Sequence, residues 1–177
     1  MPRIKMQLNT MKKLFFFVCF IAAVGCTNAQ TQAPAPFTPP AYIPAYSILT
    51  TDSVTVTPAN LKKNKATMII YFAPDCSHCQ HLMYELKPHM KELKNMQVEM
   101  ITFVQQIKAI QTFYRDFDLK KWPNWTVGTE GYTYKVQQFY RVATTPYIAI
   151  YDKNGKPVKY IDKDPKVADI LAATKKL

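Results

Sequence analysis

Apolar positions along residues 48–177 follow two periods, and the places where the period changes predict the elements. Two runs, residues 66–73 and 98–104, are almost wholly apolar, as in strands that are buried on both faces of a sheet. Between them, four apolar residues recur at helical spacing: Leu82, Leu86, Met90 and Leu93. They predict a helix from Cys76 to about residue 95, kinked at Pro88 because proline lacks the N–H of a helical hydrogen bond.

The remaining elements complete an alternation of strands and helices. The pattern predicts helices at 107–117 and 134–140, an aromatic loop at 120–128 and a short strand at 53–57. Strands at 147–151 and 157–161 are joined by Asn154-Gly155, a dipeptide typical of hairpin turns. Asp164 is the expected N-cap of a last helix at 165–175. The order β, βαβα, ββα predicts an α/β fold.

Residues 1–25 have the pattern of an export signal. Lys12 and Lys13 precede an apolar run at 14–24, which is too short to span a bilayer comfortably and is followed by small residues. Two processing sites compete: Cys26 follows "AVG", as in a lipoprotein signal whose cysteine is lipidated, whereas "TNAQ" offers ordinary cleavage after Ala29. With either site we expect export to the periplasm or cell envelope, and a membrane tether if Cys26 is lipidated.

Residues 26–47 are rich in proline and alanine, which predicts an extended, semi-rigid tether. The length of the rest suits one domain with a core that folds without covalent staples. The expected organisation is therefore a signal at 1–25, a tether at 26–47 and a single domain at 48–177.

The charge of the chain changes this picture little. Removal of residues 1–25 takes away four of the 23 basic residues and none of the 12 acidic ones, so the formal net charge falls from +11 to +7. The basic residues are scattered singly and in pairs, without a dense run or a nucleic-acid-binding motif. We interpret them as a solvated surface and expect no nucleic-acid partner.

Cysteine usage is more informative than charge. Of four cysteines, Cys19 lies within the signal and Cys26 is removed or lipidated, which leaves Cys76 and Cys79. A disulfide between them closes so short a loop that it restricts the unfolded chain very little. The pair is therefore a poor structural staple, and redox chemistry or metal binding explains it better.

The stretch "YFAPDCSHCQH" places Cys76 and Cys79 in the first turn of a helix that follows a buried strand. The free N–H groups and the positive end of the helix dipole favour a thiolate there, and the spacing of three residues puts both sulfurs on one face. We predict that Cys76 is the exposed nucleophile and Cys79 the resolving thiol. His78 is expected to favour the thiolate, whereas Asp75 opposes it by like-charge repulsion unless it caps the helix.

The segments "MIIYFAPDCSHC" and "VATTPYIAIYDKNGKPVKYI" together resemble the thioredoxin superfamily, and most closely its exported TlpA-like and ResA-like thiol-disulfide oxidoreductases. The resemblance covers about residues 53–177. It implies a thioredoxin fold, with a central mixed sheet flanked by helices and an extra strand and helix between residues 122 and 140. It also implies a cis-proline at Pro146 that faces the dithiol. A cis bond there leaves the backbone of Thr145 turned outward to pair with a substrate peptide.

The same resemblance implies that the protein exchanges disulfides with cysteine-containing envelope proteins, by default in the reductive direction. A membrane electron donor would reset the pair, and no cofactor beyond a Cys76–Cys79 disulfide is needed. Two acidic residues of such relatives are absent, because Ile70 and Leu82 stand where they would fall. This absence, and the histidine at the third position of "CSHC", keep an oxidising or isomerising role open.

Two alternatives of other classes remain. Cys76, Cys79, His78 and His81 lie within six residues, and sulfur with imidazole suits Cu(I) or zinc. No second ligand cluster accompanies them in the sequence, so the prediction is that no metal is bound. A non-catalytic binding module that keeps the fold is the other alternative. The aromatics Trp122, Trp125, Tyr132 and Tyr134 are interpreted as packing rather than as a binding surface.

Overall fold

The computed structural model describes residues 37–175 and 177, and residues 38–177 form one compact unit. The predicted export signal and the first half of the predicted tether, residues 26–36 with Cys26, lie outside the described residues. None of the helices in the described part of the chain is long and apolar enough to cross a membrane.

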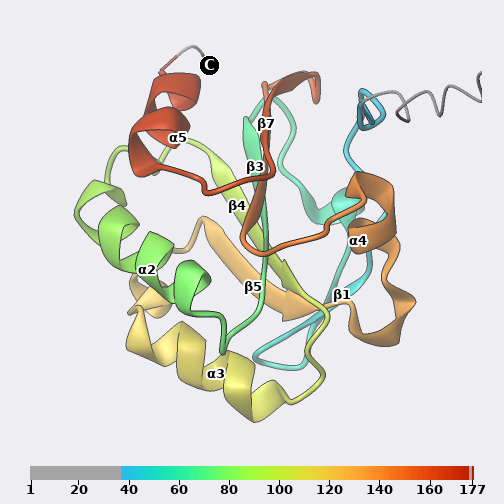
Figure 1. The fold of residues 1–177 in the computed structure, drawn as a ribbon, viewed down its shortest axis with the longest axis vertical. Coiled ribbons are helices and arrows are strands. Elements are labelled where there is room, and N and C mark those ends of the chain that lie inside the picture. Colours follow the sequence, from blue (N-terminus) through green and yellow to red (C-terminus); the bar gives the residue numbers. More distant parts are fainter. Residues whose placement is uncertain (1–36, 176) are drawn as a thin grey trace, which may run out of the picture. The chain divides into compact units, whose positions relative to one another are not determined.

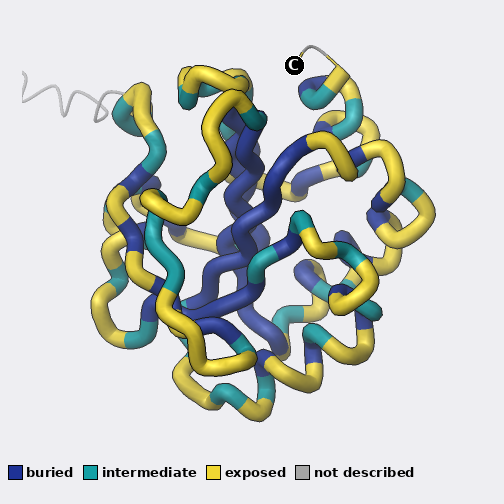
Figure 2. The backbone as a smooth tube through the Cα atoms, turned by 180° about the vertical axis from the view of Figure 1, so that it is seen from behind, coloured by how far each residue is buried: buried dark blue, intermediate teal, exposed yellow. Residues whose placement is uncertain are grey.

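Three parallel strands form the centre of the sheet. They are β3 (Thr67–Phe72), β4 (Gln97–Thr102) and β5 (Trp125–Thr129). Every residue of β3 and β4 is buried, as their apolar runs predict. Helices and loop segments cover both faces of the sheet at these strands. Figure 2 shows these strands as the continuous buried centre of the fold.

Four further strands complete a seven-stranded mixed sheet in the order β2-β1-β5-β4-β3-β6-β7. Strands β6 (Tyr147–Tyr151) and β7 (Pro157–Ile161) form the predicted antiparallel hairpin beside β3. At the other edge lie β1 (Ile48–Thr50) and β2 (Thr55–Val56), which pair with each other and, through β1, with β5. The prediction of an α/β fold around a mixed sheet is confirmed.

Four α-helices and four short 3₁₀ helices accompany the sheet in the described residues. The α-helices are α2 (Ser77–Leu86), α3 (Ile107–Asp116), α4 (Lys135–Tyr140) and α5 (Val167–Thr174). The 3₁₀ helices are η1 (Pro58–Asn60), η2 (Lys87–His89), η3 (Leu119–Lys121) and η4 (Gly131–Thr133). Strand β5 and helix α4 stand where the extra strand and helix are predicted, before the strand that follows Pro146.

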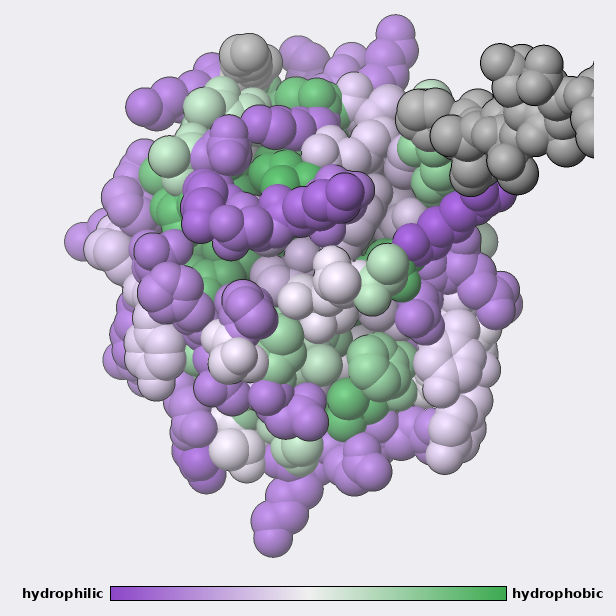
Figure 3. Space-filling view, in the orientation of Figure 1, coloured by the Kyte–Doolittle hydropathy of each residue, from purple (hydrophilic) through white to green (hydrophobic). Residues whose placement is uncertain are grey.

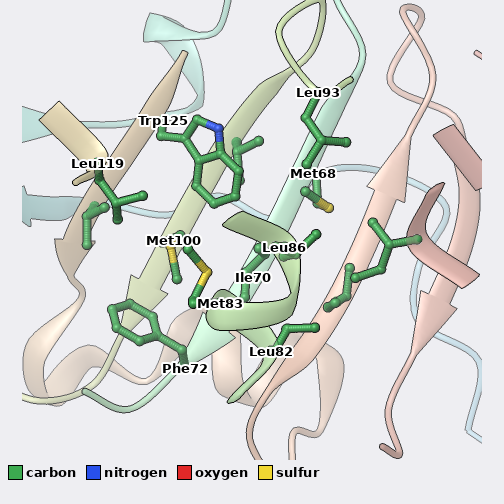
Figure 4. Packing of buried hydrophobic residues seen from close by; sticks show 14 of the residues in the cluster. Met68, Ile70, Phe72, Leu82, Met83, Leu86, Leu93, Met100, Leu119 and Trp125 are labelled. Atoms are coloured by element: carbon green, nitrogen blue, oxygen red, sulfur yellow. The ribbon is translucent and has the colours of Figure 1, made fainter. Parts of the chain in front are cut away.

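Helices α2, α3 and α5 cover one face of the sheet and α4 covers the other (Figure 1). On the first face, Leu82, Met83 and Leu86 of α2 point onto the central strands (Figure 4). This follows from the helical spacing of their apolar positions and gives α2 a fixed place at the end of β3. The start of α2 carries the two cysteines, so the main core holds the dithiol in position.

The second face of the sheet is built largely from tyrosines, and we call it the tyrosine face. Tyr140 and Tyr151 share a buried hydrogen bond of 2.6 Å between their hydroxyl groups. The Tyr151 hydroxyl also donates to the Tyr42 carbonyl at 3.2 Å, and the Tyr160 hydroxyl donates to that of Pro40 at 3.2 Å. Tyr46 is buried in the same cluster. Residues 40–46, the end of the segment predicted as a tether, are thereby held on the domain.

Some predicted boundaries are wrong. The helix from Cys76 ends at Leu86 instead of reaching residue 95, because Pro88 cannot donate to the carbonyl four residues before it and the chain tightens into η2. The predicted strand at 53–57 is reduced to β2. The predicted loop at 120–128 already contains the start of β5, which begins at Trp125.

The N-cap of the last helix is also different from the prediction. Helix α5 begins at Val167 with Lys166 as its N-cap residue, and Asp164 adopts a left-handed backbone with φ of 43°. The Asp164 carboxylate is engaged by the Lys166 ammonium group at 2.6 Å. Asp164 therefore forms an ion pair just before the helix. The prediction was instead that its carboxylate accepts hydrogen bonds from the first N–H groups of the helix.

Candidate functional site

The end of β3 delivers the two cysteines to the first turn of α2. Cys76 is the N-cap residue, and the backbone N–H of Cys79 donates to its Sγ at 3.4 Å. A thiol thus takes the place of the serine or aspartate oxygen that more often caps a helix. The cap points the Cys76 sulfur at the N–H groups of the first turn, which stabilise a thiolate.

The two thiols have opposite properties. Burial opposes ionisation of Cys76, but hydrogen bonds from the Cys79 and Thr145 side chains and from the N–H groups of Cys79 and His78 outweigh it, so its pKa lies below the ordinary value. Cys79 is only 1% exposed, and burial together with its hydrogen bond to Cys76 raises its pKa to about 12. At neutral pH Cys76 is the thiol closer to ionisation, while Cys79 keeps its proton.

The loop before β6 lies against the cysteines. The Thr145–Pro146 peptide bond is cis, and the Cys76 thiol donates to the Thr145 carbonyl at 3.5 Å. The structure therefore brings Cys76, Cys79, Thr145 and Pro146 together, although 67 positions separate Cys79 from Pro146 in the sequence. Both cysteines are free thiols in this structure.

The other two predicted site residues stand beside this group. His78 is exposed on α2, and its backbone N–H is the part that acts on Cys76, while its side chain lies near enough to Asp164 to help lower the pKa of that carboxyl. Asp75 is exposed in the turn before the helix and is not its cap. The influence of the His78 imidazole on the dithiol stays a prediction.

Sequence reasoning missed two buried carboxyl groups. Glu130 is 4% exposed and accepts hydrogen bonds from the Tyr71 hydroxyl at 2.7 Å and from the backbone N–H of Val136 at 2.8 Å. It therefore joins the end of β3 to the first turn of α4. Glu99, also 4% exposed, lies on the tyrosine face in register with Ile69. A single acid inside an apolar strand run was the available signal for Glu99.

The alternative of a metal site gains no support from the described residues. They contain no group of three or more histidine, cysteine or acidic side chains arranged to hold a metal ion. His81 and His89 instead contact Glu85 at 3.3 Å and Glu92 at 2.6 Å on the surface. Of the four aromatics interpreted as packing, Trp125 is buried and Trp122 packs against the core, whereas Tyr132 is 76% exposed.

A mixed sheet of this order, a Cys-x-x-Cys at the start of the helix after a central strand, and a cis-proline opposite it define a thioredoxin-fold protein. The model of the family described as "thioredoxin-like domain" matches residues 56–173, and the chain belongs to that family. No curated protein matches the sequence.

Solved structures share the fold at low sequence identity. A secreted Mycobacterium tuberculosis disulfide oxidoreductase homologous to Escherichia coli DsbE is 15% identical, with a TM-score of 0.64 over 75% of this chain and 96% of that one. A Bacteroides fragilis thiol-disulfide oxidoreductase is 18% identical, with a TM-score of 0.63 over 76% and 98%. A peroxiredoxin-like protein from Aquifex aeolicus is 17% identical, with a TM-score of 0.63 over 79% and 87%. At these identities the structures show a shared fold and nothing more. It is the thioredoxin fold that the sequence predicts.

Proposed function

We propose that the protein is an exported thiol-disulfide oxidoreductase that exchanges disulfides with protein partners in the cell envelope, by default in the reductive direction. The observation that carries the proposal is the asymmetry of the dithiol. Cys76 is accessible and its pKa is lowered, whereas Cys79 is buried with a pKa of about 12, and the two sulfurs share a hydrogen bond. This is the arrangement that one attacking and one resolving thiol require.

Each cysteine has its own step in the reductive direction. The Cys76 thiolate attacks one sulfur of a partner's disulfide, which forms a mixed disulfide and expels the partner's other sulfur as a thiolate. Cys79 then loses its proton and attacks the Cys76 sulfur, so that the second partner thiolate leaves. Two electrons have passed to the partner, and the protein holds a Cys76–Cys79 disulfide. A membrane electron donor would reduce it again, and no further cofactor takes part.

Two features support a location in the envelope. Residues 1–25 have the pattern of an export signal, and Cys26 is a candidate for lipidation. One structural neighbour is a secreted disulfide oxidoreductase. A lipidated Cys26 would keep the domain near the membrane donor that the reductive direction needs.

An oxidising or isomerising role is the second candidate, and the lowered pKa of Cys76 favours it. Stabilising the thiolate stabilises the reduced protein, which raises the reduction potential. Equilibration of the purified domain with glutathione measures that potential. A value near −270 mV, as in thioredoxin, supports the reductive role, and one between about −180 and −120 mV supports the oxidising role. Changing His78 to proline should lower the potential, because it removes both the imidazole and the backbone N–H that bonds to the Cys76 sulfur, and an unchanged or raised value would contradict the electrostatic argument.

Trapping of the mixed disulfide tests the proposed function directly. A Cys79→Ser variant expressed with its own export signal should accumulate covalent adducts with envelope proteins that disappear on reduction, because the resolving step is lost. The double variant that also carries Cys76→Ser is the control and should show none. If adducts form equally in both, or in neither while Cys76 remains alkylatable, the proposed function is wrong.

A further inference from the structure

The fold gathers at one end of the sheet many of the lysines that the sequence scatters. Four segments meet there: residues 61–66, 87–96, 117–124 and 152–156. The first three precede the parallel strands β3, β4 and β5, which start side by side. Thr67 of β3 pairs with Gln97 of β4, and Val98 of β4 pairs with Trp125. The fourth segment is the β6–β7 turn, which joins them because Tyr151 of β6 pairs with Thr67. We call the surface of these four segments the basic end.

The basic end carries the whole excess of positive charge of residues 26–177. Its four segments contain ten lysines and three acidic residues, whereas the rest of residues 26–177 contains nine basic and nine acidic residues. Nine of the ten lysines are exposed. Among the described residues, only Lys87 and Lys121 of the ten form an ion pair, and both pair with Asp118 at 3.2 Å. An order that is scattered in the sequence therefore becomes a one-sided charge distribution in the fold.

Side-chain hydrogen bonds hold three of these segments side by side. The side-chain amide of Gln97 accepts from the Lys62 backbone N–H at 2.9 Å and donates to the Lys65 carbonyl at 3.4 Å. The side-chain amide of Asn124 donates to the Met96 carbonyl at 3.0 Å. The lysines of these segments therefore project from one backbone framework, which fixes the density of charge at the basic end.

The first described residues lie at this same end. The Tyr151 hydroxyl, at the end of β6, donates to the Tyr42 carbonyl at 3.2 Å, which places residues 40–42 near the β6–β7 turn. In Figure 1 this turn and these residues lie at the top, whereas the connection from β3 to α2 lies in the lower half. Figure 3 shows hydrophilic side chains projecting from the upper edge. Because Cys76 caps the start of α2, the dithiol lies at the opposite end of the sheet from the lysines.

We propose that the basic end docks onto a membrane surface of anionic phospholipids. Each lysine near such a surface strengthens binding roughly fivefold, so several acting together suffice for reversible docking. The stretch from Cys26 to Pro40 spans at most about 50 Å, so a lipid on Cys26 would keep the lysines within reach of the headgroups. Docking in this orientation leaves Cys76 facing away from the membrane, where it can meet partner proteins. The inference goes beyond the proposed function and takes from it only the location at a membrane.

Sedimentation with lipid vesicles tests the inference. Residues 27–177 contain the whole compact unit of residues 38–177 and lack the predicted lipidation site, so any binding comes from the protein itself. The partition coefficient is compared between vesicles of phosphatidylcholine alone and vesicles that also contain phosphatidylglycerol. Binding should be at least about tenfold stronger to the anionic vesicles, and it should weaken as salt rises from about 0.1 to about 0.5 M. Equal binding to both kinds of vesicle would overturn the inference.

Two triple variants of equal net charge locate the binding surface. The first replaces three exposed lysines of the basic end: Lys62→Gln, Lys63→Gln and Lys153→Gln. The control replaces three exposed lysines that follow the ends of β4, β5 and β7, at the other end of the sheet: Lys108→Gln, Lys135→Gln and Lys163→Gln. The first variant should bind anionic vesicles at least about tenfold more weakly than the wild type, and the control should differ by less than about threefold. Equal losses would show that net charge alone governs binding, which would overturn the inference.

A nucleic acid is the other polyanion that a lysine-rich surface attracts. If the wild type binds a short DNA duplex more tightly than anionic vesicles at the same salt concentration, the membrane is the wrong partner.

Alkylation of Cys76 by a maleimide in the reduced protein tests the orientation. Its rate should be the same within about twofold for free and vesicle-bound protein, because the thiol stays accessible. Greater protection would mean that the dithiol end faces the lipid, contrary to the inference. Each of these results leaves the proposed function to the trapping of mixed disulfides, so the two can fail separately.

Discussion

The buried carboxyl of Glu99 makes stability fall as pH rises through the neutral range. Its side chain lies among the apolar residues of the tyrosine face, and burial raises its pKa to about 7 even though a hydrogen bond with Thr126 acts the other way. Its Oε2 atom has no hydrogen-bond partner among the described residues. Glu99→Gln keeps the shape and removes the ionisation, so it isolates the effect of the charge.

The sign and size of this pH dependence follow from the pKa of Glu99 in the unfolded and the folded chain. An unfolded glutamate has a pKa near 4.5, and the folded one keeps its proton up to about pH 7. Between these values only the unfolded chain releases the proton, so rising pH favours unfolding by at most about 1.4 kcal/mol per pH unit. The stabilisation of the folded state is complete below about pH 4.5 and is lost as pH rises through 7. The whole effect of Glu99 amounts to about 3 kcal/mol.

Urea unfolding followed by far-ultraviolet circular dichroism at pH 5, 6, 7 and 8 measures this dependence. Relative to Glu99→Gln, the wild type should lose about 2 to 3 kcal/mol of unfolding free energy between pH 5 and 8. Asp116→Asn is the control, because that carboxylate is exposed and paired with Arg115 at 2.8 Å. A plot of its unfolding free energy against pH should run parallel to that of the wild type. Parallel curves for wild type and Glu99→Gln would refute the argument that a buried carboxyl carries the effect.

Three further predictions concern the dithiol, the sheet edge and the tyrosine face. Alkylation of reduced Cys76 by iodoacetamide, followed by mass spectrometry, should have its pH midpoint below the value of about 8.5 for a free cysteine, and a midpoint at or above it would contradict the lowered pKa. Gly128→Ala should cost about 1 to 3 kcal/mol in urea unfolding, because the new Cβ would stand 2.8 Å from the Leu49 carbonyl oxygen of β1, and an unchanged midpoint would mean that the edge strand yields freely. Tyr151→Phe should cost about 1 to 2 kcal/mol by leaving the buried Tyr140 hydroxyl without its partner, and wild-type stability would show that the pair contributes little.

Elements with strong local signals could be predicted from the sequence. The β6–β7 hairpin has the predicted bounds, because an Asn-Gly turn joins two short runs with clear strand patterns. Helix α3 was predicted to within one residue from its apolar spacing. The dithiol could be located because its position after a buried strand is itself a local pattern. Cys76 and Cys79 are close to each other in the sequence as well as in the structure.

What the sequence could not supply depends on contacts between distant segments. Strand β1 has three residues and exists because β5 and β2 offer hydrogen-bond partners on either side of it. The tyrosine hydroxyls that hold residues 40–46 come from strands more than 100 positions away, so the proline-rich composition of that segment gave no sign of its docking. A cavity of about 620 Å³ beside the cis-proline loop likewise gathers residues from six segments, and no periodicity in any one of them predicts it.

The difference in exposure and pKa between the two thiols follows from the residue at which α2 begins. Cys76 and Cys79 share the same helix dipole, yet burial separates them, because the N-cap lies at the surface while the next turn enters the core beside Leu82 and Met83. If α2 began one residue earlier, Cys76 would lose its place as the cap and the N–H bond that lowers its pKa. The main core fixes the start of α2 by seating Leu86 and its neighbours on the sheet. Packing several residues away from either sulfur therefore decides which thiol is accessible with a lowered pKa and which is buried with a raised one.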